Sequence, residues 1–590
     1  MPALFNQVLS WQNLRPELAG QADFSQSIDF FDLQSRARGS VSQFLQNSDR
    51  TLLVLKADQQ GEYAVLLEKF ISQFQPQALP LQGVHYHIEQ GSEQTLPKIT
   101  LQNATSVEDN FAAKKQVASA IYYDQQRLFG NLRSNGQQIE LQSGLVHQLN
   151  GGVLILSVEP LLTQVGLWER LKQLLSEQHF HWQSLHPYKP LPCDIPSYDL
   201  ALKVILLGDR TQLALLEELD ESLYQLADYG EIESYFSLDN EQAQQQWQGY
   251  VQSYAKQLGI QLTADGINRL YQLLVRESED RHCINISPLK LKEILSNTRT
   301  LVQCNELSAV QFEQYFQAKQ QQHGFLQQQT YADILHEQIY VATQGEAVGQ
   351  INGLSVIEYP GSPVSFGEPS RISCIVQLGE GEVIDVERKN ELAGNIHSKG
   401  TMIAEVCLAN ILDLPTQLPF SASIVFEQSY SEIDGDSASL ACFCVLASAL
   451  SLLPLPQSIA ITGAIDQFGL VHSVGGVNQK IEGFFAICEK RGLTGKQGVI
   501  VPSTVLNQLS LSEAVISAVK NQQFSIWAVD DVFQACEILF KRHLLVEEDS
   551  TYNEQNQPLS ELISQRLNAH SEQQKSGFWY DLLNKLSLKR

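Results

Sequence analysis

A serine and a lysine, which can carry out acyl transfer together, stand in the C-terminal third of the chain. Ser437 follows a Gly-Asp pair in the segment EIDGDSASLACFCVLASAL (432–450), whose later residues form a long apolar run typical of a buried helix. The first N–H groups of a helix lack partners inside it and lie at the positive end of its dipole. They can stabilise the oxyanion that forms when a serine attacks a carbonyl carbon. Taken alone, however, the segment is more often a plain helix cap by Asp or Ser.

Lys480 stands downstream in the segment QSIAITGAIDQFGLVHSVGGVNQKIEGFFAICEKRG (457–492). Its pattern predicts a strand (IAIT), a hairpin (GAIDQFGLVHSV) and a helix that begins after Gly476. On that helix Lys480 shares a face with the apolar Phe484 and Ile487, so we expect it to be partly desolvated. Desolvation lowers the pKa of a lysine, and a neutral amine beside a serine hydroxyl can act as its general base. A single lysine of this kind more often extends to water.

These segments resemble the peptidase domain of the Lon protease family, particularly its B branch. Four blocks carry the resemblance in family order: ERKNELAGNIHSKG (387–400), GDSAS (435–439), TGAID (462–466) and GGVNQKIEG (475–483). The resemblance implies that Ser437 is the nucleophile of a serine endopeptidase and that Lys480 is its general base.

The same resemblance implies supporting roles for four residues close to the dyad: Asp434, Gly435, Asp436 and Thr462. Of these, Thr462 and Asp436 are expected to orient or hydrogen-bond the lysine.

The N-terminal half resembles the ATPase region of the B-branch enzymes at RLFGNLRSNG (127–136) and at 144–175. Strands at 51–56, 151–162 and 200–209 alternate with helices in this half. Such alternation predicts a mostly parallel sheet that is covered on both faces.

The segment KADQQGEY (56–63) stands where this family carries its phosphate-binding loop. A working loop needs glycines, a lysine for the β/γ-phosphates and a Ser or Thr for magnesium. This chain has Lys56 in place of the first glycine, Glu62 in place of the lysine and Tyr63 in place of the hydroxyl residue. Ser157 also replaces the aspartate expected to coordinate magnesium. We therefore expect no cofactor, since both the ATP site and its magnesium site are lost.

The predicted fold is a multidomain α/β architecture. It consists of a degenerate AAA+-like parallel-sheet module, a helical lid and a Lon-type α/β peptidase domain. Composition shifts along the chain predict five parts: an N-terminal arm (1–45), the AAA+-like module (46–211), a helical lid or spacer (212–343), the Ser-Lys peptidase domain (348–545) and a C-terminal tail with a terminal helix (546–590).

Composition limits partners and compartment. The formal charge of −26 disfavours nucleic acid as a partner, because that charge repels phosphate. The apolar stretch at 438–453 is shorter than the roughly 20 residues of a bilayer span, so we expect a buried helix and no membrane association. The nine scattered cysteines form no CxxC pair, which indicates reduced thiols and a cytoplasmic location.

The predicted function is a Lon-like serine endopeptidase that cleaves unfolded proteins or peptides without hydrolysing ATP. The resemblance further implies a homo-oligomer, a hexameric ring that encloses the sites. The sequence leaves two alternatives open. One is an ATP-dependent Lon protease with an atypical nucleotide site, and the other is a non-catalytic ring scaffold or adaptor.

Overall fold

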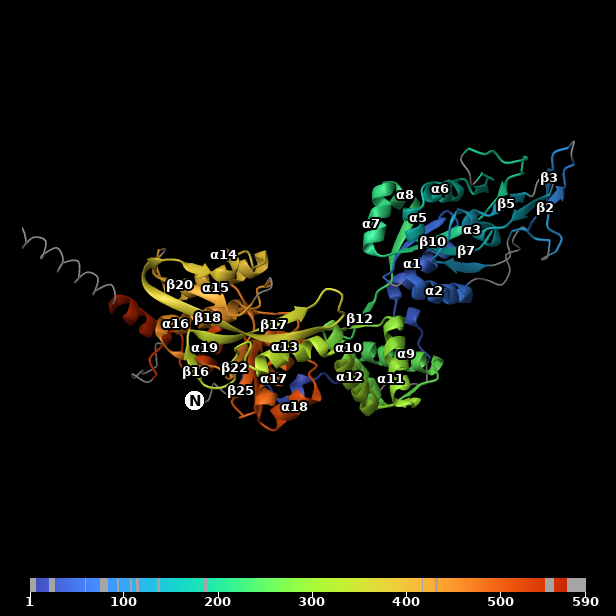
Figure 1. The fold of residues 1–590 in the computed structure, drawn as a ribbon. Helices are drawn as coiled ribbons and strands as arrows, with labels where there is room; N and C mark the ends of the chain where they lie inside the picture. The colour runs from blue at the N-terminus through green and yellow to red at the C-terminus, as the bar shows by residue number, and fades with distance from the viewer. Residues whose placement is uncertain are drawn as a thin grey trace, which may run out of the picture. The chain divides into compact units, whose positions relative to one another are not determined.

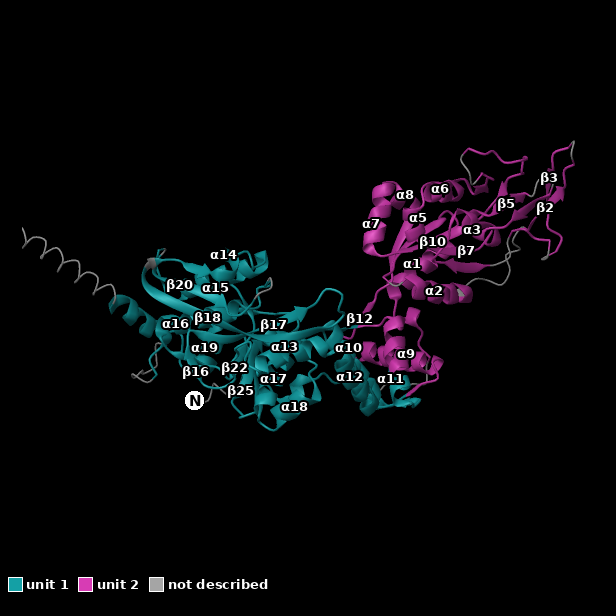
Figure 2. Cartoon of the chain, in the orientation of Figure 1, with its two compact units in different colours: residues 1–21, 262–284, 298–590 teal, residues 22–261, 285–297 magenta. Residues whose placement is uncertain are grey.

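The computed structural model of the 590-residue chain describes residues 7–20, 27–58, 60–74, 83–92, 95–106, 109–112, 116–134, 138–184, 188–415, 417–429, 433–546 and 556–569. Its contacts divide the chain into two compact units (Figure 2). Unit 1 comprises residues 1–21, 262–284 and 298–590, and unit 2 comprises residues 22–261 and 285–297. The terminal helix that the sequence predicts at 577–590 lies outside the described residues.

Unit 2 is built on a five-stranded parallel sheet with the order β11-β1-β10-β7-β4 (Figure 1). Its strands are β1 (Leu52–Lys56), β4 (Val117–Ala120), β7 (Val153–Ser157), β10 (Lys203–Gly208) and β11 (Ala227–Glu231). The three central strands β1, β7 and β10 are buried at nearly every position, as parallel strands covered on both faces must be. They fall inside the three strands that the sequence predicts, and the predicted parallel sheet is confirmed.

Alternate side chains of β1 pack on opposite faces of this sheet. Leu52 and Val54 belong to the apolar cluster that contains Trp168, whereas Leu55 lies next to Ser40 and Gly230 on the other face. Figure 1 accordingly shows helices on both faces of the sheet. The helices of this unit are α1 (Ser35–Gln46), α2 (Gln60–Phe74), α3 (Gln125–Phe129), α4 (Leu145–Gln148), α5 (Glu159–Thr163), α6 (Leu167–Glu177), α7 (Arg210–Leu219), α8 (Leu223–Leu226) and α9 (Glu241–Gln257).

The sheet of unit 2 includes a strand that the sequence does not predict. β11 falls where the pattern after residue 212 indicates only helices, and its sequence ADYGE carries Asp228 and Gly230, which disfavour strands. Backbone pairing with β1 at the sheet edge overrides that preference. Two antiparallel hairpins were also not predicted: β2 (Val84–Glu89) with β3 (Lys98–Asn103), and β5 (Asn131–Ser134) with β6 (Ile139–Gln142).

Unit 1 contains a seven-stranded mixed sheet with the order β19-β20-β18-β17-β22-β25-β26. Its strands are β17 (Gln350–Glu358), β18 (Ser365–Gly381), β19 (Val383–Asp385), β20 (Leu418–Phe426), β22 (Ile459–Ile461), β25 (Gln497–Pro502) and β26 (Phe524–Val529). Strands β17, β18 and β20 pair antiparallel, whereas β17, β22, β25 and β26 pair parallel. The predicted change to strands and turns near 348 thus corresponds to the first hairpin of this sheet.

Of the helices of unit 1, α16 (Ser439–Ser451) lies inside one of the apolar cores and is buried at every position from Ser439 to Leu450. The others are α10 (Ala264–Ser278), α12 (Ala309–His323), α13 (Phe325–Leu335), α14 (Val386–Lys389), α15 (Asn395–Ile411), α17 (Val477–Arg491), α18 (Glu513–Lys520) and α19 (Val532–Phe540), while α11 (Pro288–Val302) belongs partly to each unit. The buried helix predicted at 438–453 is confirmed. Over the described ranges, no helix combines the length and apolar character needed to cross a bilayer.

The nine cysteines all carry free thiols, as the sequence predicts. Six of them are buried, including Cys442 and Cys444 of α16. The core of unit 1 therefore depends on packing and not on covalent cross-links.

Candidate active site

The structure brings Ser437 and Lys480 together in unit 1. Lys480 Nζ lies 3.0 Å from Ser437 Oγ, within hydrogen-bonding distance. Ser437 is in the turn immediately before α16, and Lys480 is in the first turn of α17, where its N–H donates to the carbonyl of Gly476. Helix α17 begins at Val477, where the sequence predicts it to begin.

Two glycines place α17 close enough to the sheet for this contact. A Cβ on Gly367 of β18 would lie 2.0 Å from the carbonyl oxygen of Gln479, and one on Gly483 would lie 2.3 Å from the carbonyl oxygen of Gly367. Neither distance is sterically possible for another residue without a backbone shift. The helix therefore packs backbone against backbone on β18, and this fixes the position of Lys480.

Burial controls the protonation of Lys480. Its side chain is 4 % exposed, and desolvation lowers the pKa of Lys480 to about 8. The charges of Glu279 and Asp436 act in the opposite direction and favour the ammonium form. With a pKa near this value, about a tenth of the molecules carry a neutral amine at pH 7, roughly 300-fold more than for an unperturbed lysine.

Thr462 completes a three-residue contact with the dyad. Its side chain is fully buried, and its Oγ1 lies 3.3 Å from Lys480 Nζ and 3.3 Å from the carbonyl oxygen of Ser437. The hydroxyl can thus accept from the amine while it donates to the backbone of the serine. The structure brings Thr462 to the amine, in the arrangement expected for a residue that orients it.

Gly435 and Asp434 shape the turn that carries the serine. Gly435 adopts a φ of +99°, a left-handed conformation that favours glycine. The exposed carboxylate of Asp434 accepts hydrogen bonds from the backbone N–H groups of Gly435, Ile396 and His397, and the first of these is the main reason its pKa is lowered. Because Ile396 and His397 lie in the first turn of α15, Asp434 caps that helix and anchors the turn to it.

Asp436 acts on Lys480 through its charge, and its carbonyl oxygen accepts from the N–H of Ser439. A Cβ on Gly400 of α15 would lie 3.1 Å from the Cα of Asp436, so α15 also supports this side of the turn. The block at 387–400 therefore contributes a platform for the Gly-Asp-Ser turn.

The backbone donors near the serine differ from those expected at the start of a helix. The N–H of Ser439 donates to Asp436 and that of Leu440 donates to Gly463, so neither is available to an oxyanion. The carbonyl of Ser437 accepts from the N–H of Gly463. Among the described residues, the N–H groups of Ser437 and Ala438 have no such acceptor, and both belong to the turn itself.

Sequence reasoning missed one charged residue of this site, Glu279. It lies at the C-terminal end of α10, in the stretch whose pattern shows only amphipathic helices. Its carboxylate accepts from the N–H of Gly476 at 2.9 and 3.0 Å, and its charge acts on Lys480. No motif marks this glutamate, because its partner lies far along the chain.

In unit 2, the residues that flank the loop between β1 and α2 contact other side chains of the protein. Tyr63 is fully buried, its ring stacks on that of Phe30 with centroids 5.4 Å apart, and its hydroxyl lies 3.3 Å from Ser234 Oγ. Lys56 is paired with Asp58 at 2.8 Å. Lys56 and Tyr63 thus contact neighbouring side chains, and Glu62, which stands in place of the phosphate-binding lysine, lies half-buried in the first turn of α2.

Ser157, which stands in place of the expected magnesium-coordinating aspartate, is also hydrogen-bonded within the protein. Ser157 is fully buried and donates to Gln60 Oε1 at 2.5 Å, and the amide of Gln60 donates in turn to Gln212. This chain of hydrogen bonds links the start of α2 to the end of β7 and to α7. The side-chain polar atoms at this position therefore bond to one another.

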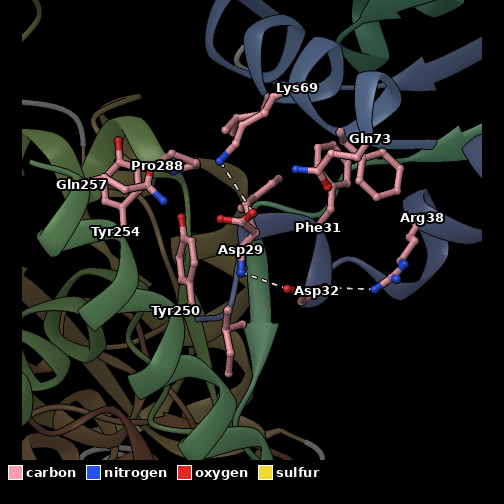
Figure 3. A pocket seen from close by; sticks show the side chains of 14 residues that line it. Asp29, Phe31, Asp32, Arg38, Lys69, Gln73, Tyr250, Tyr254, Gln257 and Pro288 are labelled. Atoms are coloured by element: carbon pink, nitrogen blue, oxygen red, sulfur yellow. Dashed lines mark hydrogen bonds and ion pairs between the residues drawn. The ribbon is translucent and has the colours of Figure 1, made fainter. Parts of the chain in front are cut away.

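A pocket of about 100 Å³ lies beside Phe30 in the same unit. Figure 3 shows that its cations face its carboxylates: Lys69 points to Asp29 and Arg38 to Asp32. The distances within these ion pairs are 3.6 and 3.0 Å. Each positive charge that lines the described wall of the pocket therefore already has a carboxylate partner.

Comparisons with known proteins agree with both units. A family model described as a LonB-like AAA domain matches residues 107–228, within unit 2. The chain is 60% identical over 576 residues to a Lon protease homolog of Haemophilus influenzae, covering 97% of this chain and 96% of that protein. It is 43% identical over 544 residues to a Lon protease homolog of Escherichia coli, covering 90% and 91%. An archaeal Lon protease of Methanocaldococcus jannaschii is 37% identical over 145 residues, which are 23% of this chain and 21% of that protein. Because the likeness spans nearly the full length of the first two relatives, the chain belongs to the Lon protease family.

Proposed function

We propose that the protein is a serine endopeptidase that cleaves unfolded proteins or peptides with a Ser437–Lys480 dyad, and that it does so without hydrolysing ATP. The observation that carries the proposal is the 3.0 Å contact between Ser437 Oγ and the buried amine of Lys480. A desolvated lysine with a lowered pKa is a competent general base for a hydroxyl.

In the proposed reaction, neutral Lys480 takes the proton of Ser437 as Oγ attacks the scissile carbonyl. In this proposal the N–H groups of Ser437 and Ala438 stabilise the resulting oxyanion, because neither has a backbone acceptor among the described residues. The ammonium then returns its proton to the leaving amine, and an acyl-enzyme remains. Water that gives a proton to the same amine hydrolyses the ester and restores the serine.

Thr462, Asp436, Asp434 and Gly435 have supporting roles in this proposal. Thr462 keeps the amine directed at the serine through its two hydrogen bonds. Asp436 adds a negative charge that stabilises the ammonium formed during attack. Asp434 and Gly435 hold the turn in shape.

The independence from ATP rests on unit 2. A bound triphosphate needs unpaired donors and a magnesium ligand, but Lys56 is paired with Asp58, Tyr63 is packed on Phe30, and Ser157 is bonded to Gln60. Without ATP-driven unfolding, substrates have to reach the dyad already extended. We also propose that the chain works as a homohexamer, which native mass spectrometry can test.

The experiment that tests the proposal is hydrolysis of unfolded casein by the purified chain, with and without ATP and magnesium. The expected result is cleavage at the same rate in both conditions and none by the Ser437→Ala variant. Cleavage only with ATP would identify an ATP-dependent Lon protease. Absence of cleavage in both conditions would favour the non-catalytic scaffold.

A further inference from the structure

Two side chains from the end of α10 hold the first two turns of α17, the helix that carries Lys480. Glu279 accepts from the N–H of Gly476, the residue that caps α17, with both carboxylate oxygens within 3.0 Å. Gly476 adopts a φ of +65°, and a Cβ there would lie 2.4 Å from a methyl group of Val356. The start of α17 is therefore confined between Glu279 and β17.

The second contact is an ion pair one turn earlier on α10. Arg276 donates to both oxygens of Glu482, at 2.8 and 2.5 Å, and their side chains are 17 % and 13 % exposed. The pair is also tied to the backbone, because Arg276 donates to the carbonyl of Ser510 and Glu482 accepts from the N–H of Ser512. A bidentate, mostly buried pair of this kind fixes direction as well as distance.

Lys480 lies between these two anchors. Its N–H donates to the carbonyl of Gly476 at 2.9 Å, and Glu482 follows two residues later. A shift of either anchor would move the amine relative to Ser437, where a displacement of about 1 Å is enough to reduce a rate strongly.

The charges around the amine come from two elements. Glu279 of α10 acts on Lys480 most strongly and Asp436 of the serine turn acts second. Two other acids near α17, Glu482 and Glu368 of β18, instead act on the hydroxyl of Tyr331. Glu279 is therefore the main anionic neighbour of Lys480 that lies outside the four sequence blocks at 387–483.

We propose that the C-terminal turn of α10 is a positioning element of the dyad, in which Glu279 and Arg276 fix the start of α17 and Glu279 sets the charge environment of Lys480. This inference rests on the proposed function. It means that the helical segment before the peptidase blocks controls both the place and the protonation of the general base.

The test replaces Glu279 by glutamine, which retains an oxygen for the N–H of Gly476 and removes the charge. The pH dependence of kcat/KM for an unfolded peptide is measured for the wild type and Glu279→Gln, with Glu489→Gln as the matched control at the exposed far end of α17. Loss of a nearby anion disfavours the ammonium form of Lys480. We therefore expect the acidic limb of the kcat/KM profile to shift to lower pH by about half a pH unit or more in Glu279→Gln and not in the control. A merely structural glutamate would lower the rate at all pH values and leave the limb in place, which would overturn the inference.

A second readout does not need peptidase activity. Trace acetylation of the intact chain over a series of pH values, followed by mass spectrometry of the peptide that contains Lys480, reports the titration of the amine directly. The same downward shift in Glu279→Gln is expected there. An unchanged titration would refute the inference even if the wild type cleaves peptides, whereas an inactive wild type with a shifted titration would refute the proposed function alone.

Glu279→Asp covers the case in which Glu279→Gln fails to fold. Aspartate keeps the charge but shortens the reach to Gly476, so kcat should fall several-fold while the acidic limb stays near its wild-type position. A variant with wild-type kcat would show that the contact positions nothing.

Discussion

Two segments that lead into a helix, the connection from β1 to α2 in unit 2 and the Gly-Asp-Ser turn before α16 in unit 1, differ in what their polar side chains contact. In unit 2, Tyr63 in the first turns of α2 is buried, and Lys56 and Ser157 have protein partners. In unit 1, the turn before α16 presents Ser437 to a buried amine. Both segments lie in units that resemble Lon protease domains. Family membership alone therefore does not show whether a unit can bind nucleotide or cleave peptides. What decides is whether the polar groups are hydrogen-bonded to neighbouring side chains, as in unit 2, or whether a nucleophile faces a general base, as in unit 1.

The largest effect should come from replacing the amine. Lys480→Arg keeps a positive charge that stays protonated at any accessible pH, so no general base remains. We expect peptide hydrolysis to fall by about 10³-fold or more, measured as kcat/KM on an unfolded peptide. Lys490→Arg, on the exposed end of the same helix, should behave as the wild type. Equal activity of both variants would remove the dyad from the mechanism.

Acidification should reproduce part of that loss without a mutation. Because the pKa of Lys480 is lowered to about 8, the neutral amine is the minor form below that pH. The rate should therefore fall about tenfold per unit as the pH drops below 8 and should level off above it. A kcat/KM profile that stays flat down to pH ~6 would show that the active base is not this amine.

Loss of the Thr462 hydroxyl should have an intermediate effect. Thr462→Val keeps the shape of the side chain but removes both of its hydrogen bonds, to Lys480 and to Ser437. We expect kcat to fall about tenfold while KM changes little, because one buried hydrogen bond of this kind is worth about 1–2 kcal/mol. A change confined to KM would place Thr462 in substrate binding instead.

The smallest effect on catalysis should come from a substitution in unit 2, which should lower the free energy of unfolding instead. Tyr63→Ser removes a fully buried ring that stacks on Phe30, so we expect a loss of about 3 kcal/mol in the free energy of unfolding. Thermal unfolding monitored by circular dichroism measures it. Peptide hydrolysis below the melting temperature should not change. Micromolar, magnesium-dependent ATP binding by the wild type, measured by isothermal titration, would contradict the account of this loop.

Much of the fold follows from local pattern. The apolar runs that become β1, β7 and β10, the buried helix α16 and the start of α17 after Gly476 are all visible in the sequence. In each case, burial or a glycine determines the local structure. Strand β11 was missed because ADYGE lacks strand propensity and is held by pairing with β1.

In the candidate site, too, the contacts between residues of the sequence motifs were expected, and those that join distant segments were not. The contact of Ser437 with Lys480 was expected from motif order, and so was the approach of Thr462. Glu279 could not be found, since its role arises from a hydrogen bond to Gly476 that joins distant segments. The sequence also could not show that the first two N–H groups of α16, those of Ser439 and Leu440, donate to the carbonyls of Asp436 and Gly463. Such partners become visible only when the chain is folded.

The most direct test of the account is the reaction of Ser437 with a fluorophosphonate in the absence of ATP, followed by intact-mass and peptide mass spectrometry. The account predicts a single adduct on Ser437, with a labelling rate that rises with pH to a plateau, has an apparent pKa of about 8, and is lost in Lys480→Arg. Labelling at another serine, or labelling of Ser437 that is unaffected by Lys480→Arg, would contradict it.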